Sequence, residues 1–374
     1  MKIAVAKETS PLEARTALTP DAVKKLAALG ANITIETGAG AGSAIADAAF
    51  AAAGATIAAS AREAYLSADI VCAVNMPGAE MITHIPEGAH LIGMLAPLDG
   101  STDFTPVLTR KLHAYALELL PRISRAQAMD VLSSQSNLAG YRAVIEAVAE
   151  TSKVLPMMMT AAGTVPPAKA LVLGAGVAGL QAIATAKRLG AVVSAFDVRP
   201  AVKEQVQSLG AKFVEVAADE AGETAGGYAK EMSEDYKRRQ SQAIHDTLKT
   251  QDIVISTALI PGKPAPELIT EAMLKDMKPG SVIVDMAAAS GGNCKLTTRD
   301  EVTTVHGITL LGFTNLPSRA ARDATPLYAR NLVNFITTLM VNKEKQFQVN
   351  FEDELIQGTL VTRGGEIVHK MLKG

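Results

Sequence analysis

The sequence contains no tryptophan, and Phe, Trp and Tyr together make up only 4% of its 374 residues. It also lacks an excess of either charge, because 36 Lys and Arg residues stand against 38 Asp and Glu residues. Few aromatic side chains leave little for stacking bases, and a net charge of −2 provides no basic surface for nucleic-acid phosphates. The composition therefore excludes a protein that binds nucleic acid.

Cysteine is scarce as well. Cys72 and Cys294 are isolated, and no histidine stands at metal-ligand spacing from them or from another histidine. We interpret both as reduced thiols of a cytoplasmic protein and expect no metal site. The N-terminus carries no secretory signal, and no apolar run reaches the ~20 residues that a membrane span needs. We therefore expect no direct membrane insertion.

The length and the pattern of the chain indicate two α/β domains. With 48% hydrophobic and 20% charged residues, it suits a globular protein with two sizeable cores. Short apolar runs alternate with helical patterns, which is typical of parallel sheets covered on both faces. We expect two Rossmann-like parallel-sheet domains separated by a nucleotide-binding cleft. Their expected limits are 1–125 plus about 325–374 for an N-terminal domain with a returning C-terminal segment, 126–150 for a long bridging helix, and 151–324 for the NAD-binding Rossmann domain.

The strongest motif is a glycine turn between an apolar strand, residues 170–173, and a helical pattern. Gly174 permits a tight turn, Gly176 lets the backbone approach a pyrophosphate, and Gly179 lets the helix pack closely against the strand. The phosphates would bind at the N-terminus of the helix, where N–H groups are free. The turn therefore predicts a dinucleotide site, the alternative being a purely structural turn in another βαβ unit.

Asp197 follows the next expected strand about 20 residues later, where an acidic side chain accepts hydrogen bonds from the adenosine ribose. Its carboxylate favours NAD over NADP because it would repel a 2′-phosphate, whereas Arg199 two residues later keeps NADP open. The cofactor-binding residues expected in this domain are Gly174, Ala175, Gly176, Val177, Gly179, Asp197, Val198, Arg199 and, after a later strand, Leu259.

A second set of candidates surrounds the expected start of the bridging helix. Ligands of open α/β sheets bind beyond the carboxyl ends of the strands, and residues 121–124 follow such a strand. The side chains of Gln127 and Asp130 suit hydrogen bonds to a nicotinamide ribose and carboxamide. Helix caps and surface cations explain the same residues without a ligand. The expected set is Arg122, Ile123, Ser124, Gln127, Ala128, Met129, Asp130 and Ser133.

One polar segment, residues 219–242, interrupts the alternation of strands and helices. It contains Gly227 and a single aromatic residue in its first half, Tyr228, and its second half suits a solvated helix. Two interpretations stay open: a surface excursion, or a mobile lid that folds Tyr228 over a bound nucleotide.

Several segments resemble one family. Lys7-Glu8 with residues 13–20 is similar to the N-terminal signature shared by alanine dehydrogenases and proton-translocating transhydrogenases. More specific are RISRAQAMDVLSSQSNLAGYRAV from Arg122, the glycine-turn segment MMMTAAGTVPPAKALVLGAGVAGLQAIATAKRLGA, ETAGGYAKEM and TALIPGKPAP. Together they resemble the NAD(H)-binding component of the transhydrogenases over essentially the whole chain.

The resemblance implies that NADH bound here exchanges hydride directly with NADP(H) held on a beta subunit, coupled to proton movement through a membrane-spanning subunit. It also implies a homodimer in the cytoplasm, peripheral on the inner face of the cell membrane through its partner subunits. In the family, Asp197 matches the ribose contact, and Gly227 and Tyr228 lie on the loop that closes on the nucleotide. The residues that match the catalytic positions are Arg122, Gln127, Asp130, Ser133 and Tyr228.

Alanine dehydrogenase is the alternative, since it shares the fold and Arg15. The resemblance implies a lysine in a KVKEP-like segment and a histidine in an HLA-like segment for that enzyme. Residues 73–77 read AVNMP and residues 94–96 read MLA, so both side chains are missing. A third interpretation is a non-catalytic NAD-sensing module, which would keep the glycine turn without needing the residues from Arg122 to Ser133 or Tyr228.

Overall fold

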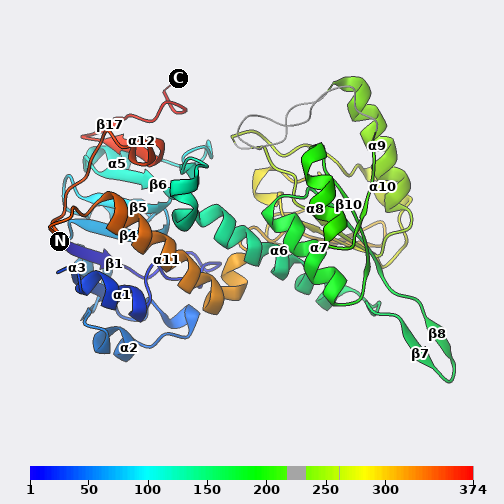
Figure 1. Ribbon diagram of the computed structural model, residues 1–374, viewed down its shortest axis with the longest axis horizontal. Helices are drawn as coiled ribbons and strands as arrows, with labels where there is room; N and C mark the ends of the chain where they lie inside the picture. Colours follow the sequence, from blue (N-terminus) through cyan, green and yellow to red (C-terminus); the bar gives the residue numbers. More distant parts are fainter. Residues whose placement is uncertain (217–232, 261, 374) are drawn as a thin grey trace. The chain divides into compact units, whose positions relative to one another are not determined.

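The computed structural model describes residues 1–216, 233–260 and 262–373. The chain divides into two compact units, Met1–Gln135 with Pro317–Gly374, and Ser136–Leu316 (Figure 1). Each unit is a mostly parallel sheet with helices on both faces, so the predicted α/β class is confirmed. The unit limits differ from the expected ones at both ends of the second unit, because the helix from residue 131 to residue 150 spans the first boundary.

The first unit is built on an eight-stranded sheet. Its strands are β1 (Lys2–Val5), β2 (Asn32–Glu36), β3 (Thr56–Ala58), β4 (Ile70–Asn75), β5 (His90–Met94), β6 (His113–Ala116), β16 (Leu360–Arg363) and β17 (Glu366–Ile367). The spatial order is β17-β16-β6-β5-β4-β1-β2-β3. Strands β1 to β6 pair in parallel, whereas β16 pairs antiparallel with β6. The end of the chain therefore completes the sheet of the first unit.

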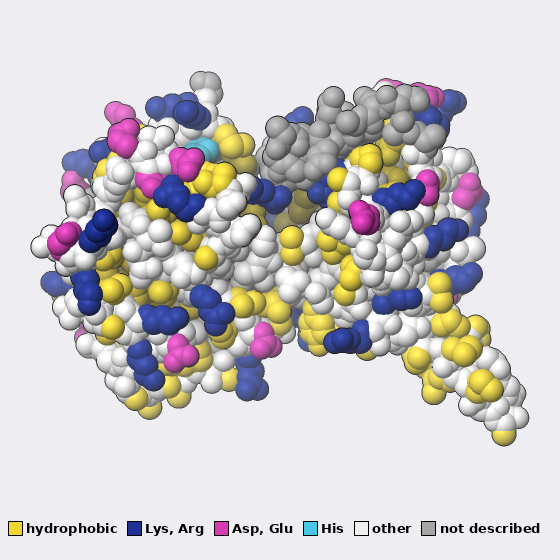
Figure 2. Space-filling model, viewed as in Figure 1, with side chains coloured by type: hydrophobic (Ala, Val, Ile, Leu, Met, Phe, Trp, Pro, Cys, Tyr) yellow, Lys and Arg dark blue, Asp and Glu magenta, His cyan; other side chains and the backbone are white. Residues whose placement is uncertain are grey.

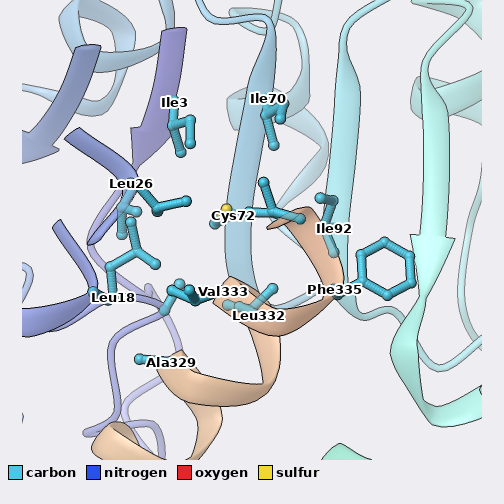
Figure 3. Close-up of a cluster of buried hydrophobic side chains, with 14 of the residues drawn as sticks. Ile3, Leu18, Leu26, Ile70, Cys72, Ile92, Ala329, Leu332, Val333 and Phe335 are labelled. Carbon is cyan, nitrogen blue, oxygen red and sulfur yellow. The ribbon is translucent and has the colours of Figure 1, made fainter. Parts of the chain in front are cut away.

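Helices cover both faces of this sheet. One face carries α1 (Pro20–Ala27), α2 (Asp47–Ala52), α11 (Ala321–Leu339) and α12 (Glu354–Thr359), and the other carries α3 (Ala61–Tyr65), α4 (Ala79–Ile82) and α5 (Thr105–Thr109). In the core of the first face, Ile70 and Cys72 of β4 lie in one cluster with Leu332 and Phe335 of α11 (Figure 3). Val71 lies in the opposite core, because successive strand residues point to opposite faces.

The second unit is built on a seven-stranded sheet. Its strands are β9 (Lys169–Leu173), β10 (Val192–Phe196), β11 (Lys212–Phe213), β12 (Ile253–Ser256), β13 (Val282–Asp285), β14 (Val302–Val305) and β15 (Ile308–Leu311). Their order is β11-β10-β9-β12-β13-β15-β14, and among the described strands of this sheet only β14 runs antiparallel to its neighbour. One face carries α6 (Val131–Glu150), α7 (Val177–Arg188) and α8 (Lys203–Ser208), and the other carries α9 (Glu234–Leu248) and α10 (Glu271–Lys275).

Three local expectations were wrong. The bridging helix does not begin at residue 126, because residues 124–129 form a 3₁₀ turn and α6 starts at Val131. The strand expected over residues 114–119 ends at Ala116, where a second 3₁₀ turn begins. The hairpin β7 (Met158–Thr160) and β8 (Gly163–Val165) was not expected at all. Its residues are mostly exposed, so no alternation of buried and solvated positions marks it.

Candidate functional site

The glycine turn of the second unit joins β9 to α7 at the point where the strand order reverses, with β10 on one side of β9 and β12 on the other. Gly174 has a φ of +95°, a conformation that residues with a Cβ rarely adopt. Its carbonyl oxygen accepts a hydrogen bond from Oγ1 of Thr257, at 3.0 Å. A Cβ on Gly179 would lie 1.8 Å from the same carbonyl oxygen, so α7 can approach the strand only with glycine there.

The N-terminus of α7 is open to an anion. The first N–H groups of an α-helix have no acceptor inside the helix, and the first turn of α7 holds no acidic residue that could occupy them. A Cβ on Gly176, the N-cap, would meet one atom of the described residues within 4 Å, Nη2 of Arg199 at 4.0 Å. Uncovered backbone at a helix N-terminus is the arrangement that binds phosphate.

Asp197 follows β10 beside this turn, and its side chain is 5% exposed. One carboxylate oxygen, Oδ2, accepts the N–H of Ala175 at 2.7 Å and Nη2 of Arg199 at 2.8 Å. The other, Oδ1, accepts the backbone N–H of Arg199 at 2.8 Å and its Nε at 2.9 Å. The charge also reaches Tyr236 of α9, whose pKa is raised by burial and then by Asp197. The structure thus gathers Asp197, Arg199 and the glycine turn at one edge of the sheet.

Asn293 organises the neighbouring loop, and the sequence analysis missed it. Its fully buried amide accepts from Oγ of Ser256 at 2.6 Å and from the N–H of Ala258 at 3.2 Å. It donates to the carbonyl oxygens of Ala258 at 2.9 Å and Pro266 at 2.8 Å. These four bonds hold the start of the loop that carries Leu259, whose side chain is exposed. Two glycines directly before Asn293 were the only local signal for a special backbone there.

In the first unit, the expected nicotinamide-side residues lie on the segment that leads into α6. The carboxylate of Asp130 accepts the N–H of Ser133 at 2.9 Å, and Oγ of Ser133 donates to its second oxygen. Asp130 therefore caps α6, which is the structural role that the sequence also allowed. Gln127 and Arg122 are exposed, as are Ile123, Ser124 and Ala128. Met129 differs from the expectation of a ligand contact through its side chain, because that side chain is buried in the core.

Helix α11 supports this segment from within the unit. Nδ2 of Asn331 and Nδ2 of Asn334 both donate to the carbonyl oxygen of Ala128, each at 2.9 Å. Oδ1 of Asn331 accepts a hydrogen bond from Oγ of Ser134 at 2.7 Å. The backbone around Gln127 is thereby fixed by residues about 200 positions later in the chain, which no local pattern indicates.

A buried polar network lies beyond the carboxyl ends of β1 and β4. Arg15 donates to both carboxylate oxygens of Glu13, at 2.8 and 2.7 Å, and to Oε1 of Gln135 at 2.8 Å. Nδ2 of Asn75 donates to Glu13 at 2.9 Å and to Glu8 at 3.3 Å. Burial raises the pKa of Glu8 to about 7, with a smaller contribution from the nearby charge of Glu13. The Arg15 guanidinium is thus already bound to a carboxylate of its own chain.

Two expected residues, Gly227 and Tyr228, lie outside the described residues. The second half of their polar segment does form a helix, α9, which begins at Glu234 with Oγ of Ser233 accepting the N–H of Tyr236. Cys72 and Cys294 are buried free thiols. Over residues 1–216, 233–260 and 262–373, no group of three His, Cys, Asp or Glu side chains could hold a metal ion. Within the same ranges, no helix combines the length and apolarity needed to cross a membrane.

Comparison with known proteins relates both halves of the chain to one family. The models for the N-terminal and C-terminal domains of alanine dehydrogenase/PNT match residues 4–139 and 143–370. The chain is 55% identical over 381 residues to an NAD(P) transhydrogenase subunit alpha protein of Rhodospirillum rubrum, covering 100% of this chain and 99% of that protein. The crystal structure of a transhydrogenase from Sinorhizobium meliloti superposes with a TM-score of 0.89 at 48% identity, covering 98% of this chain and 100% of that one. Identity to alanine dehydrogenase of Halomonas elongata is lower, 30% over 346 residues, covering 91% of this chain and 87% of that enzyme.

Proposed function

The chain belongs to the alanine dehydrogenase/PNT family, and from this we propose that it is the NAD(H)-binding component of a proton-translocating transhydrogenase. In this function it exchanges hydride directly with NADP(H) held by a partner subunit. The observation that carries the proposal is the combination of an open dinucleotide turn in the second unit with a closed arginine site in the first.

The second unit suits the adenosine and pyrophosphate parts of NAD(H). Backbone N–H groups at the start of α7 would bind the pyrophosphate, and the absence of a side chain at Gly176 leaves room for it. Asp197 would accept hydrogen bonds from the ribose hydroxyls. When bound, the nicotinamide supplies the hydride chemistry, so the chain needs no nucleophile of its own.

In the first unit, Arg122, Gln127, Asp130 and Ser133 would orient the nicotinamide end. The mutual hydrogen bonds of Asp130 and Ser133 fix both side chains before a ligand arrives, and Gln127 projects an exposed amide from the same segment. A fixed segment contributes to catalysis mainly by holding the donor ring in a reactive geometry.

Alanine dehydrogenase activity is disfavoured by the same unit. The position of the expected lysine is occupied by Asn75, which donates to Glu13 and Glu8, and that of the expected histidine by Met94. Arg15 could bind a substrate carboxylate only after losing Glu13, with which it forms a buried ion pair whose side chains are 3% and 0% exposed. Separating such a pair costs about 3–5 kcal/mol.

The proposal includes a second copy of the chain, a beta subunit and a membrane-spanning subunit as partners. The hairpin β7–β8 projects from the second unit (Figure 1), and hydrophobic side chains cover it (Figure 2). Met157, Met158 and Met159 are 61%, 46% and 78% exposed. Adjacent exposed apolar side chains mark interaction surfaces, so this arm is our candidate for the homodimer contact. Association with the inner face of the membrane would come through the other subunits.

Hydride exchange tests the function. The purified chain is mixed with the NADP(H)-binding component of a transhydrogenase, and exchange between NADH and an NADP⁺ analogue is followed. We expect exchange only when both proteins are present. Asp130→Asn should lower the rate on the order of 100-fold by misplacing the ring, whereas Arg125→Ala on the same segment, which pairs with Asp353, should leave it unchanged. Alanine-dependent reduction of NAD⁺ by the chain alone would contradict the proposal, and NADH binding without exchange would favour an NAD-sensing module.

A further inference from the structure

The Asp197 carboxylate is saturated with hydrogen bonds in the absence of a nucleotide. Each oxygen accepts two, and a carboxylate offers about four acceptor positions in all. The donors are the backbone N–H groups of Ala175 and Arg199 and the Arg199 guanidinium. Ribose hydroxyls can therefore reach Asp197 only if one of these donors leaves.

Of these donors, only the guanidinium can leave by rotation of a side chain. The N–H of Ala175 belongs to the glycine turn, whose conformation is fixed by Gly174, and the N–H of Arg199 is part of the backbone that follows β10. The Arg199 side chain retains 16% exposure, and Nη2 lies 4.0 Å from the Cβ position of Gly176. A guanidinium that leaves Asp197 thus remains beside the phosphate-binding turn.

We propose that Arg199 is a specificity-determining residue that acts jointly with Asp197, which holds the guanidinium in an ion pair and so withholds it from a 2′-phosphate. In this account Asp197 excludes NADP(H) in two ways. Its negative charge repels the 2′-phosphate, and its hydrogen bonds neutralise a cation that is placed to bind that phosphate. This inference rests on the proposed binding of NAD(H) by the second unit.

The consequence is a conditional effect of Arg199. While Asp197 is present, the guanidinium is paired, and removing it should change the affinity for NADPH little. Once Asp197 is replaced by a neutral residue, the guanidinium is released and can form charge-assisted hydrogen bonds with the 2′-phosphate. One or two such bonds correspond to about 10- to 100-fold in affinity.

The test is a double-mutant cycle on the whole chain, with dissociation constants for NADH and NADPH measured by calorimetry. We expect Asp197→Asn to weaken NADH binding and to strengthen NADPH binding at least about tenfold relative to wild type. The double variant Asp197→Asn/Arg199→Ala should lose that gain. The matched control Asp197→Asn/Arg188→Ala, which removes an exposed arginine at the end of α7, should keep it.

Three results decide the inference. An equal NADPH gain in Asp197→Asn and in Asp197→Asn/Arg199→Ala would overturn it, because repulsion by the carboxylate alone would then account for specificity. A gain that depends on Arg199, appears equally with 2′,5′-ADP as the probe and falls with added salt would support it. If Arg199 is only structural, its loss should lower the melting temperature of the Asp197→Asn protein and weaken NADH and NADPH binding alike, which would also overturn it. Failure of the wild-type chain to bind NADH would instead contradict the proposed function.

Discussion

Replacing Gly176 by alanine should separate nucleotide binding from folding. Gly176 has φ −75° and ψ −169°, an extended conformation that alanine adopts without strain. The new Cβ would meet Nη2 of Arg199 at 4.0 Å, an ordinary contact distance. Alanine gains about 0.4–1 kcal/mol by restricting the unfolded chain and loses a few tenths or more as a poorer helix N-cap. The stability of the variant should therefore stay within about 1 kcal/mol of wild type.

The affinity for NADH should fall much further than the stability. A methyl group on Gly176 would occupy the space through which the pyrophosphate approaches the first N–H groups of α7. Losing one hydrogen bond to a charged group costs about 1.5–3 kcal/mol, which corresponds to roughly 10- to 150-fold in the dissociation constant. Gly179→Ala provides the contrast. Its Cβ would lie 1.8 Å from the carbonyl oxygen of Gly174, so this variant should be destabilised by at least about 1–3 kcal/mol.

Calorimetric titration with NADH and thermal unfolding of the same preparations measure both quantities. Gly78→Ala is the matched control, because Gly78 is the N-cap of α4 in the first unit, has φ −59° and has no described atom within 4 Å of its Cβ position. Wild-type affinity for NADH in a folded Gly176→Ala variant would refute the assignment of the pyrophosphate to this turn. A large loss of stability in that variant would refute the interpretation of Gly176 as a position kept free for a ligand.

Further predictions concern buried charges of the first unit. Glu13→Leu should lower the free energy of unfolding by about 3–5 kcal/mol by leaving Arg15 unpaired, and Glu13→Leu/Arg15→Met should recover most of it in urea titrations; equal losses would contradict a net cost of the unpaired charge. Burial and the stacked ring of His113 lower the pKa of His90 to about 3, so protons bind the unfolded state more strongly between pH 6.5 and 3, and stability should fall by about 2 kcal/mol from pH 7 to pH 5. His90→Phe should remove that part of the pH dependence. Glu8 acts in the opposite sense: its pKa of about 7 means that stability falls as the pH rises from 4.5 through 7, by up to about 3 kcal/mol, and unfolding midpoints of Glu8→Gln should lack this slope.

The fold could be predicted where local rules and burial agree. Thr19 and Pro20 mark the start of α1, and Oγ1 of Thr19 accepts the N–H of Ala22 as an N-cap should. The buried strands around the glycine turn were recognised as continuous apolar runs. The start of α6 was misplaced because residues 124–129 have the composition of a helix, and only the cap formed by Asp130 and Ser133 sets its first turn.

The candidate site divides in the same way. Residues whose role depends on their own backbone, such as Gly174 and Gly179, were identified from their spacing. Residues whose role depends on a distant partner were not: Asn293, Asn331 and the Arg15 ion pair have no signature in their own segments. Side-chain amides and carboxylates bond to whatever the fold brings near them, and their neighbours in the sequence do not specify which partner that is.

By itself, then, the sequence determined the order of strands and helices, the glycine turn and the carboxylate that follows β10, because backbone sterics, helix polarity and apolar periodicity are local properties. The tertiary structure alone decided that the Arg199 guanidinium occupies the oxygens of Asp197, that Glu13 holds Arg15, and that α11 fixes the carbonyl group of Ala128. The physical reason is that a buried charge or amide must be satisfied in place, and its partner is the group that the packed chain presents within about 3 Å.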